Sequence, residues 1–171
     1  MDDPTEISLG DALTISTTLM LNNAKHTSAS IQGEDRFGTG PVPESYVSFA
    51  HTRIARDLYK SSDFTKKSNY PSQEGVPSAE YGTLGDLRIL LSTNGKVNKG
   101  ASTLGNDVFE MYSVGLESYG IVDQDGLYGE FYYNKPIDPL RLNSTTGWVS
   151  SFAPVLFNDK WVLKTRMTLG A

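Results

Sequence analysis

Short apolar runs separated by turn signals recur along most of this chain. Residues 87–91 form one such run, which closes at the turn pair Asn94-Gly95, and further strands are expected at residues 108–114 and 128–133. Runs of about four to eight apolar, β-branched and aromatic residues bounded by Gly, Asn or Asp are typical of buried strands. The sequence therefore predicts many short strands.

Two stretches have the apolar spacing of a helix. Residues 9–20 place apolar side chains at intervals of three and four, after Ser8, which can cap the first turn. The second stretch places Ile54 and Leu58 four positions apart, and Thr52 is expected to be its N-cap. Two helices with several short strands, and no repeating strand-helix-strand unit, predict an α+β fold.

The C-terminal part is predicted to form a β-hairpin. Residues 148–157 and 161–169 flank a three-residue turn at 158–160. The second arm alternates between apolar side chains on one face and Lys164 and Arg166 on the other, which is expected to be solvated. The predicted structural core of this region consists of Trp148, Phe152, Trp161, Leu163 and Met167.

A long polar, turn-rich stretch covers residues 61–81 and includes Pro71 and Pro77. Loops of this length inside a compact domain are usually functional or disordered. We expect this stretch to be mobile in the isolated chain and to contact a neighbouring subunit through Lys66, Lys67 and Tyr70.

Length and composition narrow the class of protein. A chain of 171 residues with 38% hydrophobic residues can bury one sizeable core, so a single domain is predicted. The net charge of -5 argues against a sequence-specific or electrostatic nucleic-acid binder, because phosphate contacts need a surplus of Lys and Arg. No run approaches the length of a membrane span, and the absence of cysteine excludes disulfides and thiol chemistry.

Each candidate catalytic or ligand motif lacks the residue that its chemistry needs. A glycine-rich stretch that begins like a phosphate-binding loop has Thr39 in place of the lysine. Ser118 resembles a nucleophile in a strained turn, but Leu116 occupies the position of the first glycine. His26 and His51 do not have the spacing of metal ligands. We therefore expect no catalytic residue, no cofactor and no metal site.

Several segments, in order, resemble the C-terminal half of a major capsid protein family of tailed bacteriophages and prophages. The resemblance rests on the order and spacing of Leu21-Asn22-Asn23-Ala24-Lys25, Ser45-Tyr46-Val47-Ser48-Phe49-Ala50-His51, Arg56-Asp57-Leu58, Gly82-Thr83-Leu84-Gly85-Asp86-Leu87-Arg88-Ile89, residues 108–120, Asp138-Pro139-Leu140, Gly147-Trp148 and Leu156-Phe157-Asn158-Asp159-Lys160-Trp161.

The resemblance implies the tailed-phage major capsid protein fold. About residues 8–120 would form the axial-domain core, and about residues 121–171 would form the returning strands and the C-terminal β-hairpin. The family's N-terminal arm, extended loop and long spine helix have no counterpart in this chain, which would then be a fragment, a processed product or a truncated gene product of such a subunit.

The implied role is structural, without catalysis. The chain would contact copies of itself in capsomers, and other phage structural proteins, within a virion capsid assembled in the cytoplasm of the bacterial host. In such a capsid, the face with Lys164 and Arg166 would be solvated or turned toward packaged DNA. No membrane partner is expected. The alternative is a phage-associated decoration or attachment module, which would share the α+β composition, and a hydrolase built from Ser, Asp and His is the third reading.

Overall fold

The computed structural model describes residues 4–31, 41–72, 76–123, 126, 129–136, 140 and 142–170. The chain divides into two compact units, where the sequence predicted a single domain. Unit 1 comprises Met1–Ser118 and Asp159–Ala171, and unit 2 comprises Tyr119–Asn158. The described residues form a mixed α+β structure that consists mostly of strands and contains two α-helices.

The helices lie where the sequence predicted them. They are α1 (Leu9–Leu21) and α2 (Ala55–Lys60), with 3-10 turns η1 (Thr52–Ile54), η2 (Lys67–Asn69) and η3 (Asp159–Trp161). Ser8 caps α1 as predicted, in a reciprocal capping box with Asp11. The prediction of Thr52 as a cap is wrong, because Thr52 already lies in η1 and the preceding His51 Nδ1 accepts a hydrogen bond from the Arg53 backbone N–H at 3.0 Å.

Unit 1 contains a seven-stranded sheet with the order β11-β6-β1-β4-β3-β2, and β5 also pairs with β6. Its strands are β1 (Tyr46–His51), β2 (Phe64–Lys66), β3 (Glu80–Leu84), β4 (Leu87–Ser92), β5 (Val97–Asn98), β6 (Val108–Val114) and β11 (Val162–Thr168). Strands β1 and β4 are parallel, and β6 is antiparallel to both β1 and β11. A parallel pair needs a crossover connection, and the chain from η1 to β3 supplies it.

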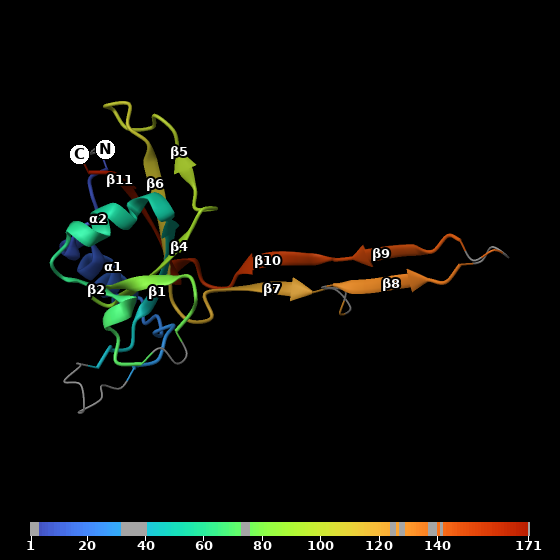
Figure 1. The fold of residues 1–171 in the computed structure, drawn as a ribbon. Helices are drawn as coiled ribbons and strands as arrows, with labels where there is room; N and C mark the ends of the chain where they lie inside the picture. Colours follow the sequence, from blue (N-terminus) through green and yellow to red (C-terminus); the bar gives the residue numbers. More distant parts are fainter. Residues whose placement is uncertain are drawn as a thin grey trace. The chain divides into compact units, whose positions relative to one another are not determined.

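The core of unit 1 joins side chains of both helices to one face of this sheet, and Figure 1 shows the two helices next to the sheet. Ile54 and Leu58 of the second helical stretch are buried there, as their spacing predicted. The hydroxyl of the fully buried Tyr46 donates to Ala24 O at 2.9 Å, so this polar group is satisfied inside the core. The large core side chains are Ile7, Ile15, Leu19, Tyr46, Ile54, Leu58, Phe64, Leu84, Leu87, Ile89, Phe109, Met111 and Met167.

The predicted C-terminal hairpin does not form. Strand β11 pairs along its whole length with β6 in unit 1. The 3-10 turn before it is fixed elsewhere, because the Trp161 indole Nε1–H donates to Asn22 O at 2.9 Å and the Asn22 side chain donates to Lys160 O at 3.1 Å. These contacts hold residues 160 and 161 against the end of α1. The two arms of the expected hairpin belong to different units, the first to unit 2 and the second to unit 1.

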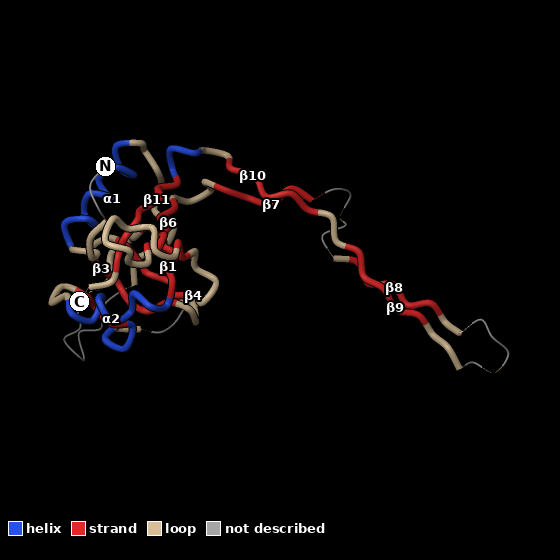
Figure 2. The backbone as a smooth tube through the Cα atoms, turned by 90° about the horizontal axis from the view of Figure 1, so that it is seen from above, coloured by secondary structure: helices blue, strands red, loops and turns tan. Residues whose placement is uncertain are grey.

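Unit 2 contains the first arm and its actual partners. Strand β7 (Tyr119–Asp123) pairs with β10 (Phe152–Leu156), and β8 (Glu130–Asn134) pairs with β9 (Thr145–Val149), in both cases antiparallel. Figure 2 shows each pair of strands side by side. The strand predicted at 128–133 corresponds to β8, and its first residue, Tyr128, lies outside the described residues.

The stretch 61–81, predicted to be a mobile loop, contains regular structure. It includes β2, η2 and the first residues of β3, and β2 pairs with β3. Phe64 is buried in the core and fixes this stretch to unit 1, which the polar composition of the stretch did not predict. Strands β3 and β4 form a tight hairpin, in which Gly85 adopts a φ of 57°, a left-handed conformation that favours glycine.

The helix α1 allows a matched test of the core. Leu19 is fully buried, whereas Leu21 of the same helix is 77% exposed. We predict that Leu19→Ala lowers the free energy of unfolding by about 2–5 kcal/mol, through lost burial and a new cavity. The same substitution at Leu21 should change it by less than about 0.5 kcal/mol. Denaturant unfolding measures both, and equal midpoints for the two variants would place α1 away from the core.

Candidate interaction surfaces

Strands β7 and β10 of unit 2 form a two-stranded sheet that exposes apolar side chains on both faces. Residues that face each other across an antiparallel pair share a face, so Ile121, Phe152 and Leu156 lie on one face and Val122 and Val155 on the other. The exposed fractions are 52%, 56% and 60% on the first face, and 50% and 39% on the second. Neither face of this pair is covered by the described residues.

The pair formed by β8 and β9 continues this pattern with aromatic side chains. Phe131 lies directly opposite Trp148, and these side chains are 70% and 75% exposed. Tyr133 lies on the same face, and Tyr132 and Val149 lie on the other, with exposed fractions between 46% and 54%. We call β7, β8, β9 and β10 together the ribbon.

The returning half of the ribbon carries no charge. Residues 142–158, which include β9 and β10, contain no Asp, Glu, Lys, Arg or His. Solvated surfaces normally carry interspersed charges, and an exposed uncharged apolar surface of this extent marks a site of interaction with another molecule.

The structure corrects two of the predicted core residues. Trp148 is 75% exposed and Phe152 is 56% exposed, because both lie in the ribbon, where the described residues place no covering layer. The other three predicted residues lie in unit 1. Trp161 and Leu163 are half-buried against its core, and Met167 is 2% exposed within it.

The three residues predicted to contact a neighbouring subunit have partners inside the chain. Lys66 Nζ lies 4.1 Å from the centre of the Tyr59 ring, and Lys67 Nζ donates to Pro77 O at 2.8 Å. Tyr70 is buried and donates to Glu80 Oε1 at 2.8 Å, so its side chain offers no surface to a neighbour. A subunit contact through the two lysines stays a prediction.

A buried carboxylate ties three strands of the sheet together. Glu110 of β6 is 2% exposed, and it accepts hydrogen bonds from Asn98 Nδ2 at 2.8 Å and from Tyr112 OH at 2.6 Å. Lys164 Nζ of β11 lies 3.0 Å from Glu110 Oε1, and Lys96 Nζ lies 3.7 Å from Oε2. Lys164, on the face expected to be solvated or turned toward packaged DNA, therefore pairs with a buried carboxylate.

These partners lower the pKa of Glu110. The hydrogen bond from Tyr112 contributes most, and the contacts with Asn98 and Lys164 add to it, so that the pKa falls to about 2 although burial alone would raise it. The carboxylate therefore stays ionised in the folded chain well into the acidic range.

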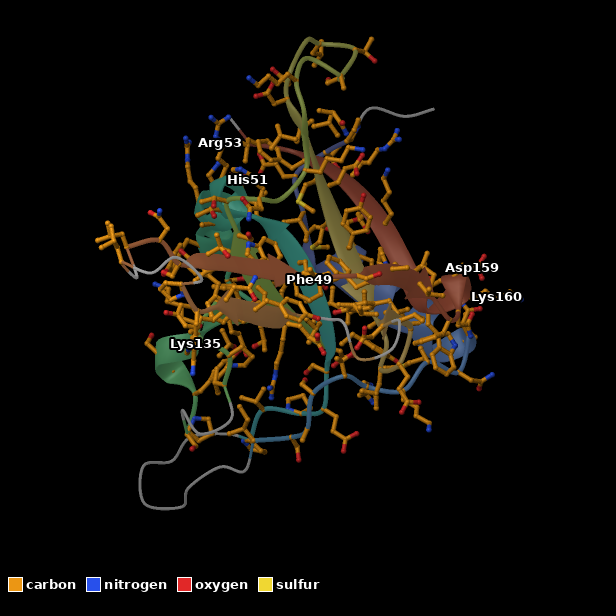
Figure 3. All side chains as sticks on the ribbon, turned by 90° about the vertical axis from the view of Figure 1, so that its right-hand side faces the viewer. Phe49, His51, Arg53, Lys135, Asp159 and Lys160 are labelled. Atoms are coloured by element: carbon orange, nitrogen blue, oxygen red, sulfur yellow. The ribbon has the colours of Figure 1, made fainter. Side chains whose placement is uncertain are left out.

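The structure describes three of the residues considered for catalysis or metal binding, Ser118, His26 and His51. Ser118 is fully buried and its hydroxyl has no hydrogen-bond partner among the described residues. His51 caps η1 and stacks against Phe109, and His26 packs on the ring of Tyr46. Figure 3 labels His51 beside Arg53. Thr39 lies outside the described residues.

The described part of the chain contains neither a cluster of metal ligands nor a membrane-spanning helix. No group of three or more His, Asp or Glu side chains there is arranged to hold a metal ion. Neither of its helices has the length and apolar character that a membrane crossing requires.

No protein-family model and no curated protein matches the sequence. Among solved structures, the chain is similar to one in the acidic stable capsid structure of Helicobacter pylori bacteriophage KHP30, with 12% sequence identity and a TM-score of 0.42. The match covers 85% of this chain and 52% of the other, so this chain spans about half the length of the one it matches.

The lowered pKa of Glu110 predicts that the folded chain loses stability at acid pH. The folded pKa of about 2 lies below the ordinary value of 4.5, so the unfolded chain binds more protons between these values and stability falls as the pH is lowered through that window. We predict that Glu110→Gln is less stable than the parent near neutral pH and loses less stability between about pH 6 and about pH 3.

Unfolding by urea at a series of pH values measures this difference. The control is Glu117→Gln, a substitution at an exposed glutamate, which should follow the parent at every pH. Parallel pH profiles for the parent and Glu110→Gln would contradict the assignment.

Proposed function

We propose that this chain is a structural part of a bacteriophage capsid subunit, and that it builds the shell through contacts between copies of itself. The observation that carries the proposal is the ribbon, which is apolar on both faces and exposed on both. An isolated two-stranded ribbon is marginally stable in water, so such a ribbon needs a partner surface. In a self-assembling shell, that surface belongs to another copy.

The size of this surface supports an interface between proteins. Among the described residues of unit 2, seven aromatic side chains are between 47% and 75% exposed, namely Tyr119, Phe131, Tyr132, Tyr133, Trp148, Phe152 and Phe157. A fully exposed aromatic side chain offers roughly 200 Å². Because these seven are on average somewhat more than half exposed, together they offer on the order of 800 Å². A stable interface buries about 800 Å² on each partner.

The sequence segments that resemble the major capsid protein family support the identity of the assembly. Under this proposal, unit 1 corresponds to the axial domain around the capsomer axis and unit 2 to the peripheral strands. The chain acts in the virion after assembly in the cytoplasm of the bacterial host. It contributes surfaces and a folded core, and it carries out no reaction.

We predict that the purified chain associates as its concentration rises and that the ribbon drives the association. The double variant Phe131→Ser, Trp148→Ser removes a facing aromatic pair that is exposed in the single chain, so it should fold normally and associate at least about tenfold more weakly. Leu104→Ser is the control, because Leu104 is 81% exposed in unit 1.

Sedimentation velocity measures the association, and electron microscopy shows whether the products are rings, sheets or shells. A parent chain that stays monomeric at every concentration contradicts the proposal. So does a double variant that associates like the parent. Binding only to shells made by another protein would favour the decoration module instead.

A further inference from the structure

Strand β9 has one edge without a partner strand. It pairs with β8 along all five of its residues (Figure 2), and no described strand pairs with its other side. An unpaired edge offers a row of backbone N–H and C=O groups to which another strand can bind. Natural proteins usually protect such edges by charge, by proline, by shortness or by a covering segment.

The other edge strands in the described part of the chain have one of these protections. The end of β11 is covered, because the Thr168 backbone N–H donates to Thr5 O at 3.1 Å. Strands β2 and β5 have only three and two residues. Strand β10 contains Pro154, which has no N–H to donate, and β7 and β8 carry the charges of Asp123 and Glu130.

Strand β9 has none of these protections. Its five residues, Thr145–Val149, include no charged side chain and no proline. Their register with β8 is continuous and contains no bulge. The open edge therefore presents a regular row of backbone donors and acceptors, which is the surface that strand addition by another polypeptide uses.

The sequence of β9 is complementary to itself. When two antiparallel copies of β9 pair so that all five residues have partners, Gly147 lies opposite Gly147 of the second copy. Trp148 then lies opposite Thr146 of the second copy, so a large side chain meets a small one on that face. Phe131 flanks Trp148 from β8, and the row of aromatic side chains continues into the second copy.

We propose that β9 of one copy pairs antiparallel with β9 of a second copy, with Gly147 at the centre of the contact. The two ribbons then share a four-stranded sheet with the order β8-β9-β9-β8, which is more stable than two separate pairs of strands. This inference rests on the proposed function, since it specifies one contact between copies.

A contact between identical strands has two-fold symmetry. It joins copies in pairs, so a shell needs other contacts in addition. The faces of the ribbon stay available for those contacts, because strand pairing uses only the backbone at the edge and leaves the side chains on both faces.

Disulfide crosslinking tests the contact in the full chain, which has no cysteine of its own. A Cβ at Gly147 meets no atom within 4 Å, so the single chain accommodates Gly147→Cys. Directly opposite residues of an antiparallel pair have Cα atoms about 4.5–5.5 Å apart, which is within the range of a disulfide. We expect most of the associated Gly147→Cys chain to form a linked dimer under mild oxidation.

Gly129→Cys is the matched control. A Cβ at Gly129 also meets no atom within 4 Å, and this residue lies in unit 2 outside β9. Its linked dimer should form at least about tenfold more slowly on a non-reducing gel. Equal rates for the two variants, or no linked Gly147→Cys dimer in an associated sample, would overturn the contact.

Charge variants give an independent readout. Gly147→Lys and Gly147→Glu each place two like charges opposite each other, and we expect each to associate at least about tenfold more weakly while circular dichroism remains that of the parent. An equimolar mixture of the two brings opposite charges together and should recover the association. Gly129→Lys should associate like the parent. A mixture as weak as either variant alone would contradict the two-fold pairing.

The results separate this inference from the proposed function. If the parent does not associate at all, both fall. If the parent associates and the variants at Gly147 associate equally well, the β9 contact is wrong, while assembly through the faces of the ribbon stands.

Discussion

The pairing of β11 with β6 is the constraint on which the rest of the structure depends. Seven residue pairs join these strands, from Val162 opposite Val114 to Thr168 opposite Val108. The pairing returns the end of the chain to the sheet of unit 1, and Gly115 N–H extends it by donating to Trp161 O at 2.9 Å. Unit 2 is therefore an insertion in the sequence between two neighbouring strands of that sheet, β6 and β11.

Unit 1 buries its large apolar side chains in a core, whereas the described part of unit 2 exposes them. Unit 1 covers one face of its sheet with two helices and fixes its polar groups through partners, as the buried Glu110 does with Lys164 across β6 and β11. The described part of unit 2 has strands that pair in twos and no helix. Its side chains remain exposed on both faces, which is why we propose that another copy supplies the surface that covers them.

Local patterns predicted much of unit 1. The helical spacing of residues 9–20, the capping residue Ser8 and the apolar run 108–114 all specify structure through near neighbours, and α1 and β6 follow them closely. The partners of the strands could not be predicted in this way. The turn at 158–160 has the composition of a hairpin loop, but its contacts with Asn22 lie far away in the sequence and direct β11 to β6 instead.

The candidate surface was visible in the sequence only in part. Large apolar residues such as Trp148 and Phe152 predict burial, and the sequence does not say whether the same chain or another covers them. The lack of charge over residues 142–158 was the available signal, because a solvated strand usually carries charge. The contact of Glu80 with Arg88 could not be predicted from the sequence, because these residues meet only through the pairing of β3 with β4.

Hydrogen exchange measured on dilute and associated samples shows whether assembly covers the ribbon. Amides of β8 and β9 should exchange rapidly in the dilute chain, and at least about tenfold more slowly in the associated sample, because a covered ribbon opens less often. Amides of β6, central in unit 1, provide the internal reference and should change little. Equal exchange of the ribbon amides in both samples would contradict the account.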